Sequence, residues 1–143
     1  MMRPDLQFSV LCEEVRQETT GRFLFLGVFG DGFVVQRTPV RLMRFCIVNR
    51  WACGEGSFRQ RTRILAPDGV TPVLDGRELD VRLKGPEALH TNIENFLGVE
   101  FREAGTHWVE VSLDGDLRMR YPFVVRVAPP RPPARPAGGD ADA

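Results

Sequence analysis

Hydrophobic and polar residues alternate along much of this chain, which is typical of β-strands that bury one face. The longest alternating run covers residues 117–127, and a second run covers residues 107–113. Asp114 and Gly115 lie between them, and an Asp-Gly pair favours the tight turn of a β-hairpin. The pattern therefore predicts an antiparallel hairpin over residues 107–127.

Further apolar-rich runs precede this hairpin and are separated by turn signals; they cover residues 6–12, 23–29, 40–51, 58–65, 79–83 and 91–101. The run 23–29 is almost wholly apolar, which predicts a central strand that is covered on both faces. About seven to nine short strands at this spacing indicate an all-β fold, an antiparallel immunoglobulin-like β-sandwich.

Composition places the boundary of this domain. The chain has 143 residues, of which 43% are hydrophobic, enough for one buried core. Residues 128–143 are Pro, Arg, Ala, Gly and Asp and include no large apolar side chain, so they are expected to form a disordered, extended tail. The domain is therefore predicted to cover residues 1–127.

Charge argues against a strongly basic function. Nineteen basic and nineteen acidic residues cancel, whereas bulk binding to nucleic acid needs a positive excess. Arg59, Arg61 and Arg63 nevertheless share one face of a predicted strand, which leaves a nucleic-acid accessory role open. Glu78 and Asp80 point outward from the next regular strand, so cross-strand neutralisation of the arginines is the favoured interpretation.

Targeting signals and cysteine usage predict a cytoplasmic protein. No apolar stretch reaches the roughly 18–20 residues of a membrane span, and the N-terminal pattern does not fit a signal peptide. Cys12 and Cys46 lie in apolar stretches and are expected to be buried free thiols. Cys53 lies in a turn; a Cys46–Cys53 bridge is conceivable, but the expected compartment does not support one.

No catalytic or metal-binding set emerges from the residue types. His90 and His107 are the only histidines and no Cys-x-x-Cys occurs, so no metal and no cofactor are expected. No serine lies in a Gly-x-Ser-x-Gly motif. Cys12 precedes two glutamates, whose charge would raise the pKa of its thiol. We therefore expect a protein that is not an enzyme.

Several segments in order resemble a known family; they are Cys12-Glu13-Glu14-Val15, Leu26-Gly27-Val28-Phe29, Ala66-Pro67-Asp68-Gly69, Ala104-Gly105-Thr106 and Tyr121-Pro122-Phe123-Val124-Val125. Together, over residues 6–127, they look like a family of small uncharacterised bacterial cytosolic proteins that contain a domain of unknown function. The resemblance implies an immunoglobulin-like sandwich. It implies no known activity and no site residue.

Three residues are expected to have structural roles: His107, Gly105 and Tyr121. In sandwich folds a Gly-x-Tyr segment often makes a tyrosine corner, in which the hydroxyl bonds back to the backbone. Here His107 stands in the position of that tyrosine, after Gly105. A ring nitrogen of histidine can make a similar bond, although the ring has less reach and can titrate. We predict that His107 is partly buried and structural.

The candidate interface residues are Trp108, Trp51, Arg50, Arg59, Arg61 and Arg63. Trp108 points to the outward side of its strand, Trp51 stands at a strand end, and exposed Trp and Arg are typical interface hot spots. A covering layer over Trp108 is an equally open alternative. The sequence thus predicts a binding or assembly module that meets a protein partner or a second copy through an edge strand or the Trp108 face.

The alternative is a module for a small ligand or a carbohydrate, which would use loop aromatics such as Trp51 and Phe33.

Overall fold

The fold is built from strands alone. The computed structural model describes residues 2–129, and within this range it contains no helix, hence none that could span a membrane. Its ten strands are β1 (Asp5–Gln17), β2 (Phe23–Val28), β3 (Gly32–Val35), β4 (Val40–Ala52), β5 (Gly56–Leu65), β6 (Pro72–Asp75), β7 (Leu79–Leu83), β8 (Leu89–Phe101), β9 (Gly105–Leu113) and β10 (Asp116–Val127). The all-β prediction is confirmed, with short strands such as β6 added to the expected set.

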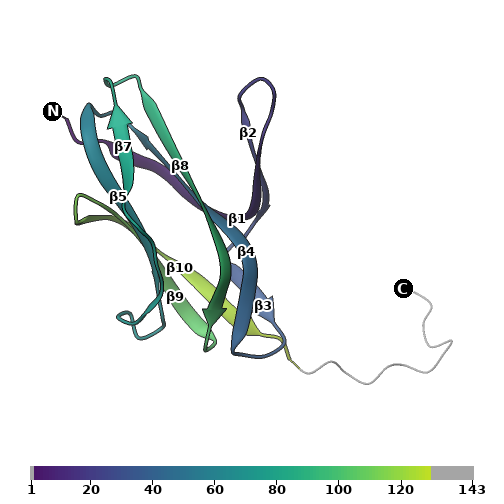
Figure 1. The fold of residues 1–143 in the computed structure, drawn as a ribbon. Helices are drawn as coiled ribbons and strands as arrows, with labels where there is room; N and C mark the ends of the chain where they lie inside the picture. The colour runs from purple at the N-terminus through teal and green to yellow at the C-terminus, as the bar shows by residue number, and fades with distance from the viewer. Residues whose placement is uncertain (1, 130–143) are drawn as a thin grey trace.

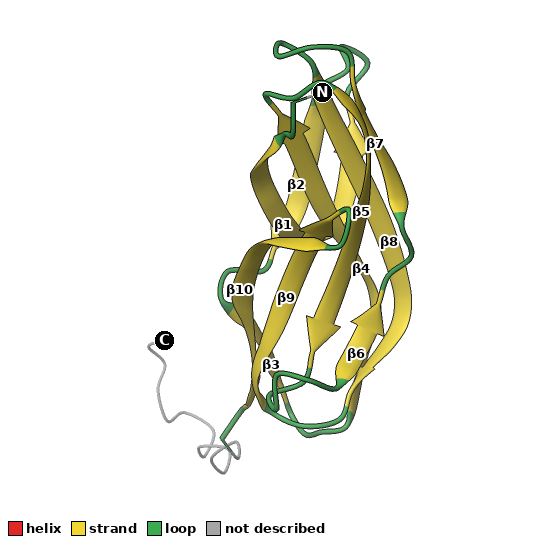
Figure 2. Cartoon of the chain, turned by 90° about the vertical axis from the view of Figure 1, so that its left-hand side faces the viewer, coloured by secondary structure: helices red, strands yellow, loops and turns green. Residues whose placement is uncertain are grey.

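The strands form two sheets that pack face to face (Figure 1). The first sheet has the order β2-β1-β4-β8, and the second has the order β3-β10-β9-β5-β6, with β7 also paired to β5. All pairs are antiparallel except β3 with β10, which run parallel. The N-terminus and the end of β10 lie at opposite ends of the molecule (Figure 2).

The core lies between the two sheets and follows the predicted alternation. In β9, the odd-numbered residues Val109, Val111 and Leu113 are completely buried, while the residues between them are half-exposed. Phe45 and Ile47 of the first sheet contribute to the same core cluster as Val109. The turn between β9 and β10 is the predicted hairpin, since Asp114 and Gly115 have the positive φ angles of 50° and 84° that such turns require.

The prediction for residues 23–29 is wrong. This apolar run is not a central strand: β2 is the terminal strand of its sheet, and Leu24, Leu26 and Val28 are 42%, 39% and 55% exposed. Strand β1 pairs with β4 as far as Cys12 and with β2 from there onward. The second half of β1 and β2 therefore form a hairpin arm, which we define as residues 13–28.

The hairpin arm covers part of the outer face of the first sheet. Phe25 from the arm packs edge-on against Phe8, with 5.9 Å between the ring centroids. Beneath them, Cys12, Cys46 and Val48 are buried and form a third apolar cluster. The apolar composition of residues 23–29 thus serves packing on one side of β2 only, and the other side is open to solvent.

Two of the remaining predictions concern the cysteines and the tail. All three cysteines are free thiols, with Cys12 and Cys46 buried as expected and Cys53 exposed. Strand β10 ends at Val127, where the sequence predicts the domain to end. The predicted tail, residues 128–143, lies outside the described residues from position 130 onward.

Candidate binding surfaces

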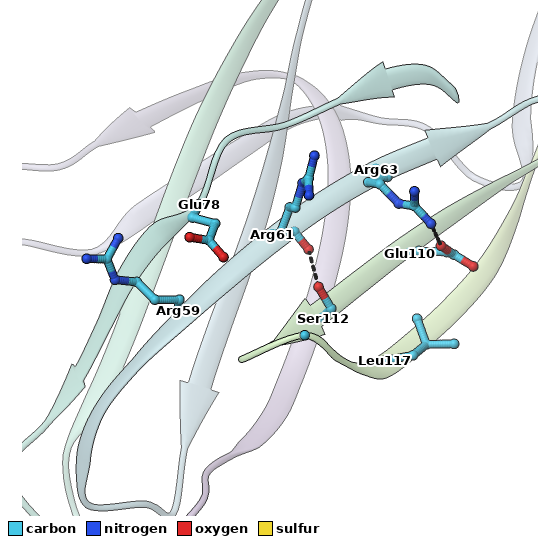
Figure 3. A pocket seen from close by; sticks show the side chains of 8 residues that line it. Arg59, Arg61, Arg63, Glu78, Glu110, Ser112 and Leu117 are labelled. Carbon is cyan, nitrogen blue, oxygen red and sulfur yellow. Dashed lines mark hydrogen bonds and ion pairs between the residues drawn. The ribbon is translucent and has the colours of Figure 1, made fainter. Parts of the chain in front are cut away.

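The arginine stripe lies on the outer face of the second sheet, where the sequence predicts it. Arg59, Arg61 and Arg63 alternate along β5 and line a shallow pocket of about 250 Å³ together with Glu78 and Glu110 (Figure 3). Alternation along β5 explains this arrangement, because Phe58, Gln60 and Thr62 take the inward positions between them.

Each arginine of the stripe has a carboxylate partner. Arg59 lies 3.2 Å from Asp80, Arg61 lies 2.7 Å from Asp75, and Arg63 lies 2.8 Å from Glu110. The prediction that Asp80 neutralises the stripe is confirmed, because β5 and β7 pair Arg59 directly with Asp80. Glu78 lines the same pocket, but the described residues provide it with no ion pair.

Trp108 lies beside this stripe and is half-exposed, as its parity predicts. Arg120 from β10 covers the indole, with its guanidinium carbon 4.7 Å from the ring centroid, a cation–π contact. The same Arg120 approaches Glu110 at 4.0 Å. With Arg82 and Arg120 included, five arginines on this face stand among four carboxylates (Asp75, Glu78, Asp80 and Glu110), and Arg82 shares Asp80 with Arg59 at 3.2 Å. Most of the basic charge on this face is therefore neutralised.

Trp51, a candidate interface residue whose exposure the sequence leaves open, is not exposed. Its side chain is completely buried, because β4 directs it between the sheets, and its Nε1 donates a hydrogen bond of 2.8 Å to Oε1 of Gln60. Arg50, its neighbour, lies on the outer face, where it donates to Thr91 at 3.0 Å and stacks over Phe8. Trp51 is thus a core residue and not an interface residue.

The aromatics proposed for a carbohydrate site are not available as a loop surface. Phe33 is half-buried and packs against Phe29, Phe101 and Phe123, with ring centroids 5.3–6.1 Å apart. Together with the burial of Trp51, this packing removes the aromatic platform on which the small-ligand alternative depended.

His107 bonds to the backbone from the corner position. Its ring is completely buried, more than expected, and its Nδ1 lies 3.1 Å from the carbonyl oxygen of Gly105. Burial lowers the pKa of this histidine, so the ring is neutral near pH 7. Gly105 has φ 129°, and an added Cβ would come within 3.0 Å of Pro67, so a side chain does not fit there.

Tyr121 joins the two sheets. Its hydroxyl lies 2.8 Å from the hydroxyl of Ser9, which belongs to β1 of the first sheet. Burial raises the pKa of Tyr121 to about 12, because the charged phenolate would be poorly solvated.

The pKa of the buried Cys12 thiol is raised, but for a different reason from the one expected. The pKa of Cys12 rises to about 11, mainly because burial disfavours the thiolate and secondly because Cys46 lies nearby. The glutamates that follow Cys12 in the sequence are not the leading cause.

A layer of polar side chains crosses the interior between the sheets, a feature that sequence reasoning missed. Asn49 donates to the hydroxyl of Thr62 at 3.1 Å, and Asn92 donates to Gln60 at 3.2 Å. Glu94 belongs to the same layer, because β8 pairs it with the core residue Ile47. We call Asn49, Gln60, Thr62, Asn92 and Glu94 the polar layer.

Three atoms of the polar layer are buried without a hydrogen-bond partner: Oδ1 of Asn49, Nε2 of Gln60 and Oε1 of Glu94. The Glu94 side chain is 9% exposed, and this burial raises the pKa of its carboxyl to about 7, a rise that Thr62 and Arg77 partly oppose. Sequence parity gave no signal for this residue, because Glu94 alternates with Phe96 but not with Ile93, Leu97 or Val99.

The fold and these surfaces define an all-β protein of two packed sheets, with a charge-paired outer face and a polar interior layer. More specifically, the chain belongs to a family of unknown function, DUF6941, whose model matches residues 7–126. The resemblance to an uncharacterised domain family is therefore confirmed. A search of curated proteins found no match.

Two solved structures share a distant likeness with the chain. One is Pseudomonas fluorescens alkylpurine DNA glycosylase AlkC bound to DNA containing an abasic site analog, at 12% identity and TM-score 0.48, covering 88% of this chain and 31% of that one. The other is β-glucosidase from Listeria innocua in complex with isofagomine, at 12% identity and TM-score 0.39, covering 85% and 17%. The chain spans less than a third of either protein, and the likeness carries no inference about function.

Proposed function

We propose that this protein is a non-enzymatic assembly module that pairs with a second copy of itself along β2. The observation that carries the proposal is the unprotected edge of this strand. The six residues of β2 include no charged residue and no proline, and three of their apolar side chains are exposed. Natural proteins usually protect edge strands with charges, prolines or very short length.

The other terminal strands carry such protection. Strand β7 presents Asp80 and Arg82, β6 begins with Pro72, and β8 includes Glu94 and Glu100. Strand β3 is only four residues long. Against these strands, β2 stands out as an edge suited to strand addition.

A second copy suits this edge better than a charged partner would. Antiparallel pairing of two β2 strands about a twofold axis brings no like charges together, because the strand is uncharged. Glu14 and Arg16 of β1, which pair with Leu26 and Leu24 across the hairpin arm, already form an ion pair of 3.0 Å. Pairing would cover Leu24, Leu26 and Val28 of both copies.

The same proposal includes the fold class and the location of the protein. The two packed sheets form a sandwich of the immunoglobulin-like class. The module works in the cytoplasm, where the exposed Cys53 thiol stays reduced. Trp108 and the arginines around it form a secondary surface for a protein partner. The nucleic-acid alternative loses its support, because the arginine stripe is neutralised by its own carboxylates.

Sedimentation of the purified protein over a range of concentrations tests the assembly. We expect a reversible dimer, and we expect Leu26→Lys to weaken it at least about tenfold, roughly 1.4 kcal/mol, because a charge would stand in the shared strand. Val70→Lys is the matched control, since Val70 is 74% exposed but lies in the turn between β5 and β6. A wild-type protein that stays monomeric at high concentration would contradict the proposal.

A further inference from the structure

A pocket at one edge of the two-sheet structure lies beside the polar layer. It has a volume of about 510 Å³ and lies where the connection from β6 to β7 faces the middle of β8. Ligand pockets for small molecules are commonly of about 300–1,000 Å³. Its wall includes Glu94 of the polar layer and Arg77 of the connection.

Glu94 gives this pocket an unsatisfied acceptor. More than nine-tenths of its side chain is buried, and the buried Oε1 has no hydrogen-bond partner. A buried acceptor without a donor is costly, which distinguishes this carboxyl from the solvated acids of the arginine stripe. A turn of the carboxyl toward a donor supplied by a ligand would remove that cost.

Arg77 supplies the opposite charge and has no competing partner. Within residues 2–129, neither Arg77 nor Glu94 takes part in an ion pair. Asp75, the other charged residue of the pocket wall, is already bound to Arg61 at 2.7 Å. The pocket therefore presents one acid and one base that are close in space and not joined to each other.

The rest of the wall is apolar. Leu74, Leu79, Ile93 and Phe96 line the pocket and are all half-buried, so each exposes part of its surface to a ligand. Small-molecule sites typically combine such apolar walls with a few convergent polar groups.

We propose that this pocket binds a small zwitterion with an apolar side chain, an apolar α-amino acid, whose ammonium group is held by Glu94 and whose carboxylate is held by Arg77. The ammonium group donates to the carboxyl of Glu94 as this turns toward the pocket, and the guanidinium of Arg77 binds the carboxylate through two parallel hydrogen bonds. The hydrocarbon side chain lies against Leu74, Leu79 and Phe96. This site is independent of the β2 edge.

The probes are L-leucine and two analogues that each lack one charge. Isopentylamine lacks the carboxylate, and 4-methylpentanoate lacks the ammonium group. By calorimetric titration we expect L-leucine to bind, and each analogue to bind at least about tenfold more weakly because one charge contact is lost.

Two substitutions assign the contacts. Glu94→Gln should weaken L-leucine about tenfold or more and leave 4-methylpentanoate unchanged, because that analogue has no ammonium group. Arg77→Gln should weaken L-leucine to the same degree and leave isopentylamine unchanged. Glu100→Gln and Arg102→Gln, at solvent-exposed positions outside this pocket, are the matched controls and should bind as the wild type does.

Two results would overturn the proposal. One is the absence of L-leucine binding to the wild type at about 10 mM, a concentration well above a specific dissociation constant. The other is an unchanged affinity in Arg77→Gln, whose exposed position makes it a safe substitution for folding.

Discussion

The two faces of β5 differ in how their polar groups are satisfied. On the outer face, Arg59, Arg61 and Arg63 each have a carboxylate within 3.2 Å. On the inner face, Gln60 is completely buried and its Nε2 has no partner. The outer face carries full charges in solvent, and the inner face carries weaker dipoles without solvent.

This difference shows where polar residues cost free energy in the molecule. Exposed ion pairs contribute little, about 0–1 kcal/mol each, because water screens both the gain and the loss. A buried polar atom without a partner costs about 1–3 kcal/mol, because no water replaces the missing bond. The alternating arginines are the more conspicuous feature of the sequence. Substitutions in the polar layer, however, should change the free energy of unfolding more.

The largest expected effect belongs to Glu94. Its pKa is raised in the folded protein from the ordinary value of 4.5 to about 7. Between these values the folded protein holds a proton that the unfolded chain has lost, so stability falls as pH rises from 4.5 to 7 and is level above. A shift of this size corresponds to about 3 kcal/mol.

Glu94→Gln removes this pH dependence, because glutamine does not titrate. We expect the variant to be more stable than the wild type at pH 8 and to lack the decline between pH 4.5 and 7. Urea unfolding at a series of pH values measures the difference. Glu100→Gln, on the same strand, should follow the wild-type curve, and an unchanged slope in Glu94→Gln would contradict the account.

A smaller loss is expected at Gln60, whose Oε1 accepts from both Trp51 and Asn92. Gln60→Leu keeps the volume but leaves the buried Nε1 of Trp51 without an acceptor, at a cost of about 1–2 kcal/mol after the removal of the unpartnered Nε2 is counted. Asn92 still donates to the carbonyl oxygen of Asp80. Denaturant unfolding followed by tryptophan fluorescence measures it. Gln7→Leu, at an exposed position of β1, is the control, and equal losses in both variants would count against a special role for the polar layer.

The smallest effects are expected on the outer face. Arg63→Ala should cost about 1 kcal/mol, since Glu110 is only 14% exposed, whereas Arg59→Ala should cost about 0.3 kcal/mol because both partners are largely solvated. Thermal unfolding at low and high salt separates the two, and only the Arg63 loss should persist in high salt. A loss well above 2 kcal/mol for Arg59→Ala would show that the stripe is not merely solvated.

The sequence predicted those parts of the fold in which one face of a strand meets the core. Residues 107–127 alternate cleanly, and their hairpin is as expected. The sequence placed residues 23–29 at the centre of a sheet and not at its edge, because an apolar strand in a hairpin arm has the same composition as a central strand. Trp51 was a candidate for the surface because the charged Arg50 beside it suggested that the strand ends there. Strand β4 in fact continues to Ala52.

The candidate sites also divide into those that the sequence predicts and those that it does not. The neutralised arginine stripe and the half-exposed Trp108 follow from parity along single strands. The pocket beside Glu94 is formed by two segments that are distant in the sequence, at positions 74–79 and 93–96, so no local pattern predicts it. The unprotected edge of β2 depends on sheet order, which alternation does not specify.

The parallel pairing of β3 with β10 has a consequence for how the chain folds. It joins Gly32–Val35 to residues 124–127, so an early segment receives its partner only after nearly the whole domain has been synthesised. Closing so long a loop is slow compared with forming a hairpin. During synthesis Phe33 and Val34 therefore remain unpaired until β10 has been made. The last few residues of β10 then complete the second sheet.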